Sequence, residues 1–62
     1  MSRDEDRFLS ALYNAIYEAH RLLSRSTLRV DWDDEEFRLV RVALAILREL
    51  LTIIEKKRRG KP

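Results

Sequence analysis

Five carboxylates stand close together in the middle of the 62-residue chain, at a density that suggests a calcium site. They are Asp31, Asp33, Asp34, Glu35 and Glu36. A calcium loop of the EF-hand type requires glycine at its sixth position and glutamate at its twelfth. Counted from Asp31, those positions hold Glu36 and Val42, so the spacing excludes this loop. We interpret the run as the start of a helix, where carboxylates cap free N–H groups, and we expect no metal site.

A second group of candidate residues combines aromatic, imidazole and hydroxyl side chains at helical spacing: Tyr13, Tyr17, His20 and Ser24. Such a row could stack against nucleobases. We favour an interface margin, in which the rings are half-buried and their polar tips reach water. His20 is the single histidine of the chain, and no serine or carboxylate stands at a spacing typical of a catalytic partner. The sequence therefore predicts neither an enzyme nor a cofactor site.

Basic side chains are concentrated near the C-terminus, and others line one edge of the apolar stretch that precedes it. The candidate nucleic-acid contacts are Arg38, Arg41, Arg48, Lys56, Lys57, Arg58 and Arg59, and the basic tail spans residues 56–62. A cationic arm can bind phosphates because binding releases their counterions. The net charge is only +2, however, and a basic last turn also complements the helix dipole. We favour this structural interpretation, which leaves nucleic acid as an alternative partner.

These candidate residues border a strongly apolar stretch, residues 37–54, that predicts a helix. Its apolar residues form two rows at spacings of three and four. One row is Phe37, Val40, Leu44, Leu47, Leu51 and Ile54, and the other is Leu39, Ala43, Ile46, Leu50 and Ile53. Together the rows cover an arc of roughly 220°, where about 100° is enough for an ordinary surface helix. Such a helix needs neighbours on two sides.

A second amphipathic helix is predicted before it, over about residues 2–25. Ser2 and Glu5 match a capping box at its start. Its two apolar rows are Phe8, Leu12, Ala15, Ala19 and Leu22, and Leu9, Tyr13, Ile16, His20 and Leu23. Alanines in the middle of the first row would allow close approach of a partner helix, while the opposite face is polar.

The segment between the helices contains the start signals of the second one. Asp33 and Glu36 form an acidic variant of the capping box, and Trp32 and Phe37 occupy the positions of a hydrophobic staple. We therefore expect the second helix over about residues 33–59, followed by Gly60 at the left-handed C′ position. Alternating apolar residues within 27–32 leave a short strand as the alternative.

The fold class predicted is all-α: one domain, residues 1–62, in which an antiparallel helical hairpin dimerises into a four-helix bundle. Both helices begin acidic and end basic, so antiparallel packing places opposite charges side by side. A chain this short needs nearly all its apolar surface buried, which two helices alone do not achieve. The residues expected in the core and dimer interface are Leu39, Val42, Ile46, Leu50, Ile53, Val40, Leu47 and Ile54.

This architecture, and the acidic turn VDWDDEEF at 30–37, resemble the Rop family of plasmid copy-control proteins. The resemblance covers the whole length and implies a dimeric four-helix bundle that binds RNA. The polar face of helix 1 that binds RNA in that family has no residue-by-residue counterpart here, so the resemblance assigns no binding residues.

The function predicted is a non-enzymatic homodimeric interaction or adaptor module with a further, unidentified protein partner. The alternatives are a small nucleic-acid-binding regulator and a designed bundle without a natural role. We expect a cytoplasmic, soluble chain without a membrane partner. The N-terminus lacks the pattern of a signal peptide, and charges at Arg41, Arg48 and Glu49 interrupt the apolar stretch.

Overall fold

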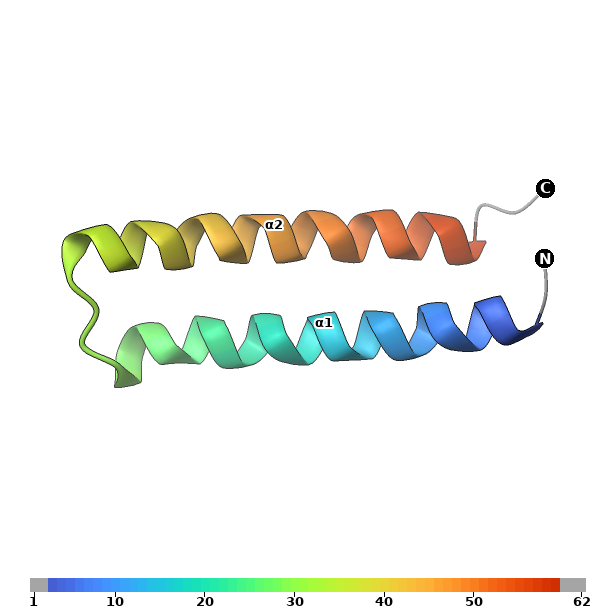
Figure 1. Ribbon diagram of the computed structural model, residues 1–62, viewed down its shortest axis with the longest axis horizontal. Helices are drawn as coiled ribbons and strands as arrows, with labels where there is room; N and C mark the ends of the chain where they lie inside the picture. Colours follow the sequence, from blue (N-terminus) through green and yellow to red (C-terminus); the bar gives the residue numbers. More distant parts are fainter. Residues whose placement is uncertain (1–2, 60–62) are drawn as a thin grey trace.

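A computed structural model describes residues 3–59 of the chain and shows a helical hairpin. Helix α1 spans Arg3–Arg29 and helix α2 spans Asp34–Arg59. The helices lie antiparallel, so the start of α1 and the end of α2 lie at the same end of the molecule (Figure 1). No strand occurs within residues 3–59. The all-helical hairpin is confirmed, and the alternative of a short strand before α2 is wrong.

The end of α1 differs from the prediction, because the helix continues past Arg25 to Arg29. Ser26 and Thr27 follow the predicted end, and hydroxyl side chains can compete with a helix for backbone groups. Here the Ser26 hydroxyl donates to the Leu23 carbonyl at 2.6 Å, and the Thr27 hydroxyl donates to the Ser24 carbonyl at 2.8 Å. Both bonds form within helical backbone, so the hydroxyls are satisfied without breaking the helix. The connection shortens to residues 30–33.

The start of α2 follows the predicted capping box. The Glu36 N–H donates to Oδ1 of Asp33 at 2.8 Å, and the Asp33 N–H donates to Oε1 of Glu36 at 3.1 Å. The first helical bond runs from the Phe37 N–H to the Asp33 carbonyl. Asp33 is therefore the N-cap, and α2 extends to Arg59, the last residue that the structure describes. The predicted caps at Ser2 and Gly60 lie outside the described residues.

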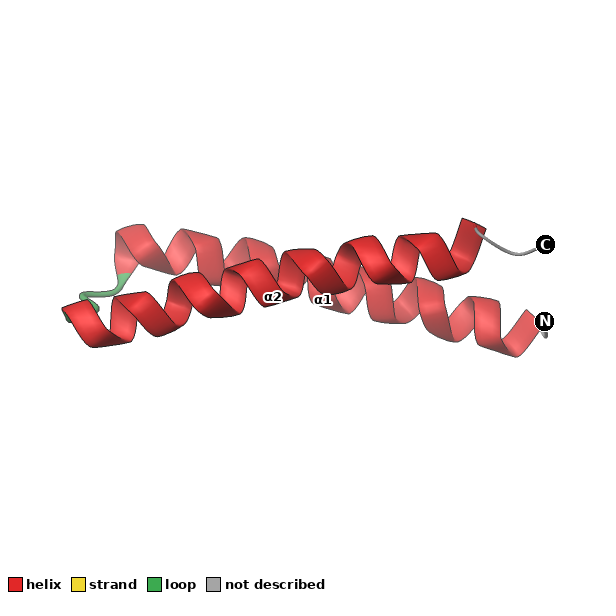
Figure 2. Ribbon diagram, turned by 90° about the horizontal axis from the view of Figure 1, so that it is seen from above, coloured by secondary structure: helices red, strands yellow, loops and turns green. Residues whose placement is uncertain are grey.

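One row of each helix forms the contact between α1 and α2. Leu9, Val40 and Ile54 are the only buried residues within 3–59. The half-buried neighbours that complete these two inner rows are Leu12, Tyr13, Ile16, His20 and Leu23 on α1, and Ala43, Leu44, Leu47 and Leu51 on α2. The helices cross at a shallow angle near their middles (Figure 2). The core is thus a single seam.

The hairpin is a thin rod that contains one layer of helices. Its Cα atoms extend over 45 × 16 × 11 Å. Their radius of gyration is 14.4 Å, whereas a compact domain of this length is expected near about 10.5 Å. Neither helix of the described part of the chain carries a stretch apolar enough to cross a bilayer.

Candidate interaction surfaces

Two flanks of different chemistry border the inner seam. With about 100° of turn per residue, positions on either side of an inner row fall on opposite faces of the hairpin. We call one face the apolar flank. It contains Phe8, Ala11, Ala15, Ala19 and Leu22 on α1, and Leu39, Val42, Ile46, Leu50 and Ile53 on α2. The other face is the grooved flank described below.

The apolar flank is open to solvent along both helices. On α2, Leu39 is 65% exposed and Ile46 is 56% exposed. On α1, Phe8 is 66% exposed, and the three alanines of the flank are exposed as well. Isolated exposed apolar residues are normal on a protein surface, but a continuous apolar face marks an interaction site.

The structure places the predicted interface residues in two separate rows. Val40, Leu47 and Ile54 lie on the inner row that packs against α1. The other five, Leu39, Val42, Ile46, Leu50 and Ile53, are all exposed. The second row of α2 therefore has no neighbour within the described hairpin.

The exposed surface area of the chain is also larger than that of a compact protein of its size. The protein exposes 5338 Å², whereas a compact monomer of 7.4 kDa is expected to expose about 4,200 Å². The difference, about 1,100 Å², exceeds the roughly 800 Å² that each partner contributes to an interface of standard size. One hairpin thus carries enough surplus surface for one stable contact.

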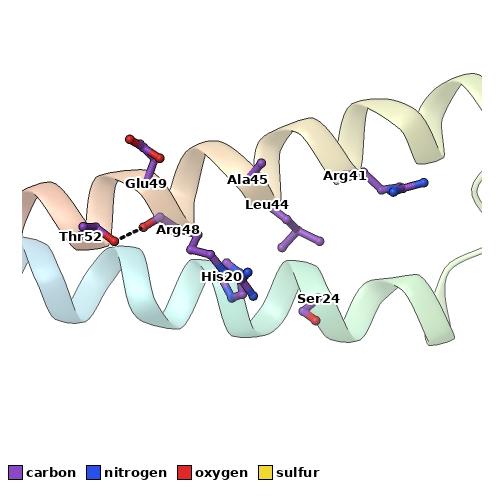
Figure 3. A pocket seen from close by; sticks show the side chains of 8 residues that line it. All are labelled: His20, Ser24, Arg41, Leu44, Ala45, Arg48, Glu49 and Thr52. Carbon is purple, nitrogen blue, oxygen red and sulfur yellow. Dashed lines mark hydrogen bonds between the residues drawn. The ribbon is translucent and has the colours of Figure 1, made fainter.

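The grooved flank carries polar side chains from both helices. A groove of about 660 Å³ is lined by His20, Ser24, Arg41, Leu44, Ala45, Arg48, Glu49 and Thr52. Arg48 extends toward His20, while Glu49 points away from α1 (Figure 3). A smaller depression of about 270 Å³ adjoins it through Arg48 and Thr52, and extends to Tyr13 and Arg59. Two arginines and the single histidine of the chain thus line the same groove.

This groove is not among the features predicted from the sequence, although its signal is present in the spacing. Arg41 and Arg48 stand seven residues apart, which places them two turns apart on one side of α2. His20 and Ser24 stand one turn apart on α1. What the spacing did not reveal is that these two edges lie on the same side of the hairpin.

The remaining basic candidates are divided among several surroundings. Arg58 and Arg59 each approach a Glu55 carboxylate oxygen at 3.7 Å. The Arg58 guanidinium also lies over the Tyr13 ring, at 5.6 Å from its centroid. Lys56 lines the smaller depression, whereas Arg38 and Lys57 line neither hollow. The predicted basic set is thus not one surface: Arg41, Arg48, Lys56 and Arg59 share the grooved flank, and residues 60–62 lie outside the described chain.

The tyrosines of this flank contact each other. The rings of Tyr13 and Tyr17 are nearly parallel, with centroids 6.4 Å apart, and Tyr17 is half exposed. Of the acidic residues at 33–36, Asp33 and Glu36 form the capping box described above, and Asp34 and Glu35 lie in the first turn of α2. Within residues 3–59 no cluster of three or more His, Cys, Asp or Glu side chains has a metal-binding arrangement.

Comparison with known proteins gives no match. No protein-family model matches the chain, and no curated protein or solved structure is significantly similar to it. The resemblance to the Rop family therefore stays a prediction.

Proposed function

We propose that this protein is a non-enzymatic interaction module that self-associates through its apolar flank. Two hairpins stack with these flanks face to face and form a four-helix bundle. The grooved flanks then face outward on opposite sides of the dimer, where each is accessible to a further partner.

The observation that supports this proposal is the unpartnered second row of α2. Leu39, Ile46 and Ile53 repeat at the seven-residue spacing of helix–helix seams, yet each remains at least 41% exposed. A second copy of the same chain is the simplest occupant, because the flank is apolar on both helices and therefore self-complementary. Burying about 800 Å² per protomer would also reduce the exposed area toward that of a compact protein.

A pair of matched variants tests the proposal. Ile46 lies on the apolar flank and its neighbour Ala45 lies on the grooved flank, so Ile46→Glu and Ala45→Glu add the same charge on opposite faces. A carboxylate buried at the dimer interface costs several kcal/mol. By size-exclusion chromatography with light scattering, we expect Ala45→Glu to remain a dimer and Ile46→Glu to dissociate.

If both variants dissociated equally, the dimer contact would not be specific to the apolar flank. A dimer that persists in Ile46→Glu would remove the apolar flank from the interface altogether.

A second function, binding of nucleic acid, is favoured by one observation: the grooved flank aligns basic and aromatic side chains. Arg41 and Arg48 line the groove, and Tyr17 offers a half-exposed ring on the neighbouring edge of α1. Cationic side chains that follow a backbone, beside a ring for base stacking, are typical of single-strand binding. The net charge of +2 makes this the weaker proposal.

Fluorescence anisotropy over a salt series distinguishes the two functions. A regulator that engages roughly six phosphates would show a log–log salt slope near −5 on duplex DNA, and a somewhat shallower slope on single strands. Arg41→Ala/Arg48→Ala should then abolish binding, while Arg38→Ala/Lys57→Ala removes the same charge away from the hollows. If the protein is an interaction module only, binding is weak and the two double variants behave alike.

A further inference from the structure

The orientation of the two protomers can be inferred from the sizes of the residues on the apolar flank. We propose that both interhelical connections lie at the same end of the dimer, and that each α2 packs against the partner's α1. In this arrangement Ile46 and Leu50 pack against the alanine row of the partner in the stretch Ala15–Ala19. The inference rests on the proposed self-association and specifies its geometry.

The two hollows of the grooved flank show which stretches of α1 and α2 lie beside each other. Tyr13 shares one hollow with residues between Arg48 and Arg59, and His20 and Ser24 share the other with residues between Arg41 and Thr52. Moving toward the C-terminus of α1 therefore corresponds to moving back along α2. Ala15 and Ala19 lie between Tyr13 and Ser24 in the chain, so the stretch of α2 beside them is the one that contains Ile46 and Leu50.

Two symmetric arrangements bring the apolar flanks face to face. A two-fold axis parallel to the helices keeps every residue at its own level and places α2 over the partner's α1. A two-fold axis across the helices, within the plane between the layers, places α1 over α1 and α2 over α2 with the connections at opposite ends. Charged helix ends alternate in sign in both arrangements, so residue size decides between them.

Large residues opposite small ones give an even distance between the two layers. The distance between packed helices varies over about 8–10 Å with the size of the contacting side chains. With α2 over the partner's α1, both contacts pair a bulky row with an alanine row. With like helices paired, alanines would face alanines on one side and isoleucine and leucine would face each other on the other side. Two flat hairpins would then leave a gap or a clash, which close-packed interiors disfavour.

The alanine row alone does not identify a partner. The exposed bulky residues at the same levels of α2, together with the surplus surface area, assign this row to a second copy of the chain.

Disulfide trapping tests the orientation, because the described chain contains no free cysteine that would interfere. We compare Ala19→Cys and Ile46→Cys, each alone and mixed after unfolding and refolding together, under mild oxidation. The proposed arrangement predicts a covalent dimer in the mixture and none from either variant alone. A disulfide requires Cα atoms within about 7 Å, and residue 46 lies diagonally opposite its own counterpart in this arrangement. Ala15→Cys with Leu50→Cys provides a second, independent mixed pair.

The failures of the two proposals are distinguishable. Covalent dimers of Ile46→Cys alone, without a product from either mixed pair, would show the arrangement with like helices paired and overturn this inference while the dimer stands. Monomeric mass of the reduced variants and of the wild-type chain, without cross-links in any sample, would overturn both proposals.

Discussion

The Arg58 guanidinium, in the last turn of α2, lies 5.6 Å from the centroid of the Tyr13 ring on α1. This contact connects the C-terminal part of α2 to the first half of α1. A cation over an aromatic ring contributes about 0.5–1 kcal/mol at an exposed site. At least one residue of the basic C-terminal segment therefore has a structural role within the hairpin.

A double-mutant cycle tests this contact. Tyr13→Leu and Arg58→Ala should each destabilise the protein, with a coupling free energy of about 0.5–1 kcal/mol in chemical unfolding. Tyr13→Phe is the control, because it keeps the ring and should retain the coupling. Strictly additive effects of Tyr13→Leu and Arg58→Ala would show that the two side chains do not interact in solution.

The capping box at the start of α2 gives a second prediction. Asp33→Ala removes the acceptor of the Glu36 N–H and should lower the free energy of unfolding by about 1 kcal/mol per protomer. Asp31→Ala removes the same charge outside the helix and should have a smaller effect. Thermal unfolding followed by circular dichroism measures both. Equal melting temperatures for the two variants would place the start of α2 elsewhere.

Trp32 gives a third prediction, because it joins the connection to the end of α1. Its indole N–H donates to the Ser26 hydroxyl at 3.3 Å, and its side chain is half-buried. Trp32→Ala should cost at least as much as Asp33→Ala, through the loss of buried apolar area. Trp32→Phe keeps most of this area and loses only the hydrogen bond, so it should cost about 0.5–1.5 kcal/mol. If Trp32→Phe and Trp32→Ala were equally stable, the ring would not be packed. Phe37, the other residue of the predicted staple, is 39% exposed. The contact between Trp32 and Phe37 stays a prediction.

Local signals predicted the elements of this fold well. The capping pair Asp33 and Glu36 marks the start of α2, because its bonds involve residues three apart in the sequence. The end of α1 was harder to predict. Ser26 and Thr27 can hydrogen-bond either inside or outside a helix, and local preference does not choose between the two.

The candidate surfaces were predicted only in part, since they depend on how the helices face each other. The spacing of Leu39, Ile46 and Ile53 showed that α2 has a second apolar row, but it did not show which row faces α1. Packing assigns Val40 and Ile54 to the inner seam and leaves the other row open. The groove between His20 and Arg48 was missed because its two walls are 28 residues apart in the sequence.

Sedimentation equilibrium of the unmodified chain tests the central claim most directly. A dimer of 7.4 kDa protomers formed through the apolar flank should give a mass of about 15 kDa at micromolar concentration and physiological salt. Unfolding should also shift to higher temperature as protein concentration rises, because association is linked to folding. A folded species of 7.4 kDa, with a melting temperature independent of concentration, would contradict the account.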